Sequence, residues 1–205
     1  MASKGNRGNS LLNSEISEQY VSENWVFDEW ANFYGLNFNE HFGEERIKFM
    51  RENLEPSKGE LYRLTYPTDK EMEDWVETKY SKLKVGDTVP LQNRNMTSFS
   101  YDKERFQNFV VEQWVGGSRR GYFHHFKTLD ILVAPKGTGH FPLDGVPFVH
   151  QAETFVPSEN WVVKKIETMP YYDFFPPSFN DRERNIRLMS EKTVRLLYIE
   201  QENQE

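Results

Sequence analysis

Two polar side chains in the C-terminal part of the chain, Gln151 and Glu153, are spaced so that they can act on one small substrate. In an extended strand the two would share one face, with Ala152, Thr154 and Val156 on the other. A carboxylate held there can stabilise developing positive charge, and an amide can orient a second reactant without adding charge. Because such a pair alone is usually a solvated strand face, its meaning depends on the residues upstream.

Two further polar features precede this pair. Arg63 stands in the middle of an otherwise apolar and aromatic segment, residues 60–66. Ser98 and Ser100 alternate along a second segment that leads into a helix. Taken singly, a strand arginine is usually on the surface or in an ion pair, and such serines are usually strand-end or cap residues. The order of arginine, serine and glutamate along the chain favours a shared site.

This order resembles the arginine–serine–glutamate signature of the mono-ADP-ribosyltransferases. Four segments carry the resemblance, and they follow the family's order. The first strand resembles Leu61 to Leu64, and the Ser-x-Ser strand with the start of its helix resembles Met96 to Lys103. A strand that ends in a Pro-Lys-Gly-Thr turn resembles Val133 to Gly139, and the catalytic strand resembles Gln151 to Pro157. The Tyr101-Asp102-Lys103 continuation is similar to that of transferases from T-even phages. The match spans residues 60–166, and residues 193–200 would add a closing strand.

The resemblance implies a role for each of the three residues. NAD would be consumed as a substrate, and the bond between nicotinamide and ribose would break through an oxocarbenium-like transition state. Glu153 would stabilise the charge on the ribose and bind its 2′-hydroxyl. Arg63 would bind the pyrophosphate with its planar donor fork, and Ser98 would position the glutamate. Ser100 is expected to have a structural role near the start of the helix.

Other residues are implied in binding the two substrates. Gln151 and Phe148 match acceptor-recognition positions, although Phe148 is equally consistent with packing under its own loop. Relatives that modify arginine usually carry glutamate where this chain has Gln151, and a neutral amide cannot act as a general base. An acceptor other than arginine is therefore favoured, and a protein side chain is the first choice. Arg119 and Arg120 match a loop that covers nicotinamide and phosphate, and a solvated turn is an equal alternative for them.

The elements that must position these residues follow from periodicity. Apolar residues repeat at helical spacing over 26–34, 47–54, 72–80 and 106–114, and the last of these helices would be capped by Asp102. Alternation predicts strands over 60–66, 96–100, 122–126, 129–134, 151–156, 161–166 and 193–200. Residues 170–179, rich in proline and aromatic side chains, are expected to form an ordered loop. Helices first and strands later indicate an α+β domain.

Length and composition suit one domain with a substantial core. Of the 205 residues, 37% are hydrophobic and 15% aromatic, which excludes disorder of the whole chain. We expect a flexible tail over 1–10, a helical segment over 11–57 packed on the core, and a catalytic core over 58–205. For that core the resemblance implies two packed, mainly antiparallel β-sheets.

Charge and residue counts narrow the function classes. The net charge of −7 disfavours broad binding to nucleic acid, and the absence of cysteine excludes disulfides, thiolate metal sites and a cysteine nucleophile. No apolar run is long enough for a transmembrane helix and no signal peptide is visible, so a cytoplasmic protein without membrane contact is expected. The histidines are scattered, so no metal is expected. Lys136 to Gly139 lacks the rest of a phosphate loop and predicts a turn.

The leading hypothesis is therefore a mono-ADP-ribosyltransferase that moves ADP-ribose from NAD to a protein side chain. Three alternatives stay open: an NAD glycohydrolase, a non-catalytic protein-binding module on the same fold, and transfer to a nucleic-acid base. The similarity to phage enzymes implies an effector that acts on host proteins in the host cytoplasm.

Overall fold

The computed structural model describes residues 44, 47–65, 79–91, 95–111, 127–142, 152–176 and 189–202. Their elements, in chain order, are β1 (Glu55–Pro56), β2 (Leu61–Leu64), the 3₁₀ helix η1 (Lys79–Lys82), β3 (Met96–Ser100), α4 (Lys103–Val110), β4 (Thr128–Ala134), β5 (Gly139–Pro142), β6 (Glu153–Pro157), β7 (Trp161–Pro170), α6 (Tyr171–Phe174) and β8 (Thr193–Gln201). Within these ranges no helix is long and apolar enough to cross a bilayer.

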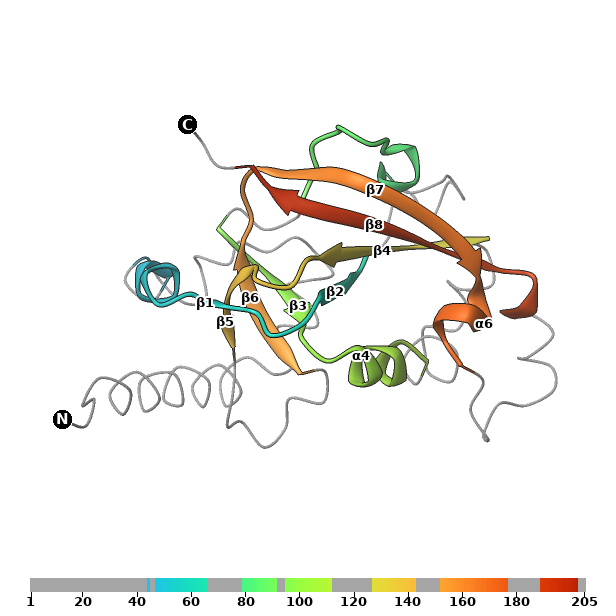
Figure 1. Ribbon diagram of the computed structural model, residues 1–205, viewed down its shortest axis with the longest axis horizontal. Coiled ribbons are helices and arrows are strands. Elements are labelled where there is room, and N and C mark those ends of the chain that lie inside the picture. Colours follow the sequence, from blue (N-terminus) through green and yellow to red (C-terminus); the bar gives the residue numbers. More distant parts are fainter. Residues whose placement is uncertain are drawn as a thin grey trace.

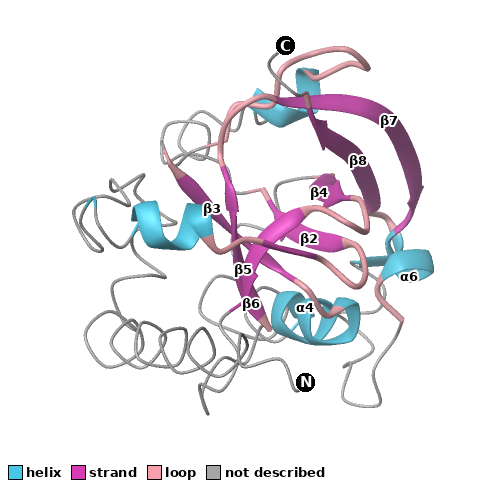
Figure 2. Cartoon of the chain, turned by 60° about the vertical axis from the view of Figure 1, so that its left-hand side comes forward, coloured by secondary structure: helices cyan, strands magenta, loops and turns pink. Residues whose placement is uncertain are grey.

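The strands join into one mixed sheet in the order β1-β5-β6-β3-β2-β4-β8-β7. Every pairing is antiparallel except that of β4 with β8. The expectation of mainly antiparallel pairing is confirmed, but the strands form one continuous sheet where two were expected. The join is narrow, because β2 pairs with β4 at four positions and with β3 only at Tyr62 opposite Ser100. The sheet bends strongly, with β7 and β8 at one end and β3, β5 and β6 at the other (Figure 2).

Both faces of the central strands are buried, since every residue of β2 and β3 and all but the first of β4 is buried. Tyr62 and Ile131 belong to a core cluster that includes residues of α4 and α6. Leu61 and Leu132, one position along, belong to a second cluster on the opposite face. Figure 1 shows α4 below β2 and α6 at the end of β7. The sheet is thus a rigid platform from which polar side chains can be held in fixed directions.

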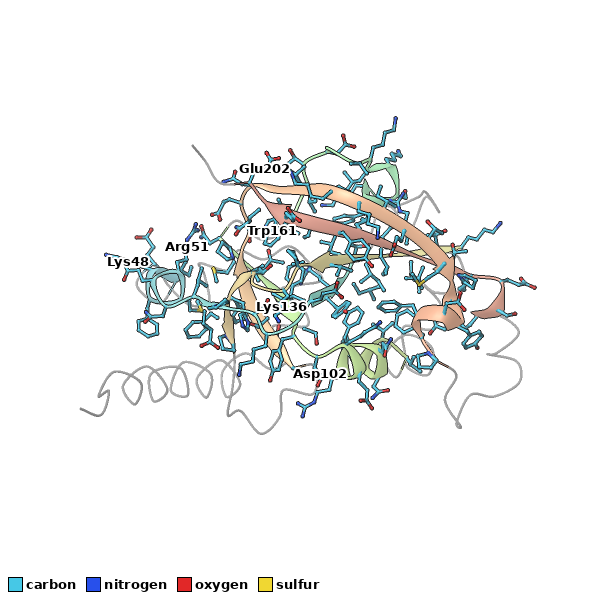
Figure 3. All side chains as sticks on the ribbon, in the orientation of Figure 1. Lys48, Arg51, Asp102, Lys136, Trp161 and Glu202 are labelled. Carbon is cyan, nitrogen blue, oxygen red and sulfur yellow. The ribbon has the colours of Figure 1, made fainter. Side chains whose placement is uncertain are left out.

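Helix α4 begins where the sequence predicts. The carboxylate of Asp102 accepts the backbone N–H of Arg105 at 3.0 Å, which caps the first turn (Figure 3). Phe106 and Val110 are buried, and the ring of Phe106 stacks on that of Tyr62 with 5.7 Å between centroids. The helix therefore fixes the position of β2 relative to the end of β3.

Part of the predicted helical segment before the core lies in the described residues. Residues 47–52 are helical, and Ile47 and Met50 pack in a cluster with β3, β5 and β6. The segment then leaves the helix, and Pro56 pairs with Gly139 in β1, a strand that the sequence did not indicate. The predicted helix over 26–34 and the predicted strand over 122–126 lie outside the described residues.

The outer edge of β7 is covered at its beginning. Gly86 donates its N–H to the carbonyl of Val163 at 2.8 Å, and Val89 donates to Trp161 at 2.9 Å. Beyond that cover the pairing of β7 with β8 shifts by one residue between Val163 and Lys165, which is a β-bulge. The strand ends at Pro170. The segment expected as a loop over residues 170–179 begins with the short helix α6, and its residues 177–179 lie outside the described residues.

Candidate functional site

Arg63 lies in β2 between buried apolar neighbours and is itself only 8% exposed. A buried guanidinium requires hydrogen-bond partners, because desolvating a charge is costly. Its Nη1 atom donates to the main-chain oxygen of Ser98 at 2.7 Å. Arg63 is therefore not a surface arginine, as a strand arginine taken singly would be. It is directed to the neighbouring strand β3.

The position of Arg63 coincides with the narrow join in the sheet. In a continued antiparallel ladder, Leu64 would lie opposite Ser98, but the recorded pairing of β2 with β3 stops at Tyr62 and Ser100. The guanidinium donates to the strand-edge carbonyl of Ser98, where a regular ladder would supply a backbone N–H. Arg63 thus bridges the two strands with a side chain.

Ser98 also contacts Glu153, the third residue of the predicted site. Its Oγ atom donates to the Oε1 atom of Glu153. The two residues are not direct partners, since Ser98 lies opposite Phe155 and Glu153 opposite Ser100. The bond is therefore a diagonal contact across one face of the β3–β6 pair. Ser98 therefore contacts both charged groups: its main-chain oxygen accepts from Arg63, and its hydroxyl donates to Glu153.

Glu153 is the first residue of β6 and is half-buried, while the four residues after it are buried. A carboxylate in this setting is anchored by the strand yet reachable from solvent. Charge-assisted hydrogen bonds such as that from Ser98 are about twice as strong as neutral ones, so the orientation of the carboxylate is well defined. The arrangement can stabilise positive charge on a substrate that approaches the start of β6.

Ser100 has the structural role that was expected. Its Oγ atom donates to the main-chain oxygen of Asp102 at 3.1 Å. The hydroxyl thereby shapes the turn between β3 and α4. Of the two alternating serines, Ser98 is the one whose hydroxyl donates to the glutamate carboxylate.

The backbone before Glu153 differs from the prediction. The sequence predicts a strand that begins at Gln151, but β6 begins at Glu153, and Ala152 has φ of +51°. This left-handed conformation interrupts the alternation of side chains along the strand. The prediction that positions 151 and 153 share one strand face relied on that alternation and is not supported here. No signal in the sequence indicates the left-handed conformation of Ala152, because alanine is not a residue that favours positive φ. Gln151 itself lies outside the described residues.

A row of paired positions runs from Glu153 across the sheet. Ser100, Tyr62, Val133 and Tyr198 follow it on successive strands, and paired residues share a face. The hydroxyl of Tyr62 donates to the Oε2 atom of Glu60 at 2.6 Å. Periodicity identified the strands but did not indicate this row.

The two tyrosines of the row are held in their neutral form. Burial, together with the hydrogen bond to Glu60, raises the pKa of Tyr62 well above its ordinary value. Burial and the hydrogen bond to Glu167 raise the pKa of Tyr198 to about 12. Both hydroxyls are therefore donors at neutral pH, and each fixes a carboxylate. The side of the row away from Glu153 is thus acidic, with a lysine, Lys165, paired to Glu167.

Four of the predicted substrate-binding residues cannot be placed. Phe148, Gln151, Arg119 and Arg120 lie outside the described residues. Their roles remain predictions from the resemblance. Of the predicted site residues that are described, Arg63 and Glu153 both contact Ser98.

The remaining polar motifs have structural explanations. The predicted turn near Lys136 is confirmed, because the N–H of Thr138 donates to Pro135 at 3.2 Å and Gly137 has φ of +90°. The Nδ1 atom of His140 lies 2.7 Å from the hydroxyl of Thr154, which donates to a carbonyl of β5. Among the described residues, no group of three or more His, Asp or Glu side chains could hold a metal ion.

No family model and no curated protein matches the chain. Among solved structures it is similar to the ADP-ribosyltransferase Vis in complex with the M6 inhibitor, a toxin from Vibrio splendidus, with 15% identity, 92% of this chain and 73% of that chain covered, and a TM-score of 0.49.

Two further structures are similar. Plx2a, an ADP-ribosyltransferase toxin from Paenibacillus larvae, has 14% identity over 90% of this chain and 84% of that chain, with a TM-score of 0.44. The ADP-ribosylating toxin BECa of C. perfringens with NADH has 11% identity over 92% of this chain and 43% of that chain, with a TM-score of 0.43. Each of these three proteins is an ADP-ribosyltransferase or an ADP-ribosylating toxin.

Proposed function

We propose that this chain is a mono-ADP-ribosyltransferase, which cleaves the nicotinamide–ribose bond of NAD and transfers ADP-ribose to a protein side chain. The observation that supports the proposal is that Arg63, Ser98 and Glu153 meet at the join of β2, β3 and β6. A cation, a hydroxyl and a carboxylate fixed together on a rigid sheet suit a substrate that is anionic at its phosphates and becomes cationic at its ribose.

Glu153 would act on the ribose. In the reaction, the bond between C1′ of the ribose and the nicotinamide nitrogen breaks, and its electron pair leaves with nicotinamide. The positive charge left on the ribose is the charge that a nearby carboxylate stabilises. An acceptor nucleophile then forms a bond to C1′ and loses its proton. The hydrogen bond from Ser98 holds the carboxylate in place throughout.

Arg63 would act on the pyrophosphate. A guanidinium carries five N–H donors in a planar fork, and in Arg63 one of the Nη1 donors binds Ser98. The bond anchors the guanidinium to Ser98, the residue whose hydroxyl contacts the glutamate. Arginine is also fully charged at any physiological pH, so its attraction for a phosphate does not depend on titration.

The remaining roles in the proposal come from the resemblance. Arg119 and Arg120 would bind NAD, and Gln151 with Phe148 would contact the acceptor. The neutral amide of Gln151 favours a protein side chain other than arginine. An effector of this kind, encoded by a phage and active in the host cytoplasm, would meet both NAD and host proteins.

The proposal is tested with NAD labelled in its adenylate part. The chain is incubated with this NAD and a cell lysate, beside two variants. Glu153→Gln removes the carboxylate with little change of shape, and Glu159→Gln is the matched control, since Glu159 follows the other end of β6 and pairs with Arg51. Label on macromolecules with the wild type and the control, reduced about 10²-fold or more in Glu153→Gln, supports transfer.

Other outcomes separate the alternatives. Sensitivity of the labelled product to protease but not nuclease indicates a protein acceptor, and the reverse indicates a nucleic-acid base. Free ADP-ribose without labelled macromolecules indicates an NAD glycohydrolase. No consumption of NAD by folded protein would contradict both enzyme functions and leave the protein-binding module.

A further inference from the structure

The chain enters β6 through a backbone conformation that few side-chain-bearing residues adopt. Ala152 has φ of +51° and is 1% exposed. For a residue with a Cβ atom, the left-handed region is strained, because that atom approaches the following carbonyl. Such conformations persist where the surroundings hold them, and they concentrate at functional sites.

A backbone hydrogen bond holds Ala152 in place. The N–H of Tyr101 donates to the oxygen of Ala152 at 2.9 Å. This bond extends the β3–β6 ladder one step beyond Ser100 and Glu153. The neighbouring turn is itself fixed by the bond from Ser100 to Asp102. The last step of the ladder therefore falls on the left-handed residue, directly before the glutamate.

We propose that Ala152 is a positioning residue, whose clamped left-handed backbone sets the direction in which Glu153 leaves the chain. The inference rests on the proposed function of Glu153. Alanine suits the task for two reasons. Glycine would adopt the same φ without strain but would let the chain pivot before Glu153. A larger side chain would have to fit where the alanine is already almost wholly buried.

The other end of β6 provides a natural control. Asn160 also has a positive φ, +63°, and its carbonyl accepts the N–H of Glu202 at 2.8 Å. The residue is exposed and lies in the turn between β6 and β7. Asparagine tolerates this region better than most residues. A glycine at either position releases the same backbone restriction, but only one of the two adjoins Glu153.

The first test compares Ala152→Gly with Asn160→Gly in steady-state release of nicotinamide from NAD. We expect Ala152→Gly to lower kcat about tenfold and to leave KM for NAD within about twofold, because a displaced carboxylate loses transition-state stabilisation more than substrate binding. Asn160→Gly should leave both constants unchanged. Thermal unfolding of both variants shows whether the fold is retained.

The second test asks whether Ala152 acts through the carboxylate. In a Glu153→Gln background, Ala152→Gly should cause no further loss, since there is no carboxylate left to misplace. A loss of the same factor in both backgrounds would overturn the inference, as would a kcat for Ala152→Gly within twofold of the wild type. An active wild type with either result leaves the proposed function standing. A folded but inactive wild type overturns both.

Discussion

The Oγ atom of Ser98 donates to the Oε1 atom of Glu153 from a diagonal position, because Glu153 pairs in the ladder with Ser100. The same serine offers its main-chain oxygen to Arg63. One residue therefore orients both charged groups, and its removal should affect them differently: the hydroxyl can be deleted by substitution, but the carbonyl cannot.

Ser98→Ala should lower kcat for nicotinamide release about tenfold or more, because the carboxylate loses its donor and a misplaced group can cost about 10²-fold. The bond of Arg63 to the backbone stays, so KM for NAD should change little. The control is Ser158→Ala, which deletes another hydroxyl between β3 and the end of β6, one that lies 2.7 Å from that of Thr97. Equal activity of the two variants would contradict the assigned role of Ser98.

Arg63→Lys should raise KM for NAD about tenfold or more, which corresponds to one charge-assisted hydrogen bond. Lysine keeps the charge but cannot present a planar fork to both Ser98 and a phosphate. The control is Arg195→Lys. Like Arg63, Arg195 donates to main-chain oxygen atoms, and it binds the carboxylate of Asp130 at 2.8 Å, but it lies on β8. The Arg195→Lys variant should be less stable than the wild type, with KM for NAD unchanged. A KM that rises in this control but not in Arg63→Lys would contradict the prediction.

The free energy of unfolding should fall at alkaline pH, and part of the fall should come from ionisation of the Tyr198 hydroxyl. Its pKa is about 12 in the folded chain and about 10 in the unfolded chain. The unfolded chain therefore loses the proton first, and the stability from this group is full below about pH 10 and is lost as pH rises towards 12. Urea unfolding between pH 8 and 12 should show a steeper decline for the wild type than for Tyr198→Phe. Parallel curves would contradict this.

Asp102→Ala should reduce the free energy of unfolding by about 1 kcal/mol, the usual effect of losing an N-cap acceptor. Asp102→Asn keeps an acceptor for the N–H of Arg105 and should be nearly as stable as the wild type. The exposed ion pair between Asp102 and Arg105, at 3.9 Å, should contribute little. If both variants were equally destabilised, the charge and not the cap would be responsible.

The sequence predicted several strands well because the alternation of their side chains is a local signal. The strand expected over 96–100 is observed as Met96–Ser100, and that over 129–134 as Thr128–Ala134. The closing strand expected over 193–200 is Thr193–Gln201. Asp102 was recognised as a cap because its side-chain acceptor is a local signal.

What the sequence could not indicate depends on distant contacts. β1 contains Pro56, which disfavours a strand by itself, and it exists because residues near His140 pair with it. The left-handed Ala152 depends on Tyr101, which is far away in the chain. In the site, the resemblance indicated Arg63, Ser98 and Glu153, but only the structure shows that one serine joins them.

In the described part of the chain the sheet has two edges, and each has features that disfavour pairing with a further strand. β1 is only two residues long and includes Pro56, and the start of β7 is covered by the segment at Gly86. Further along β7, the bulge and the exposed Lys164 and Lys165 discourage pairing with another chain. Within the described residues, these features therefore disfavour self-association through strand pairing and the capture of an extended peptide at the two edges. Under the proposed function, a target protein would therefore be recognised through side chains and not by strand addition at these edges.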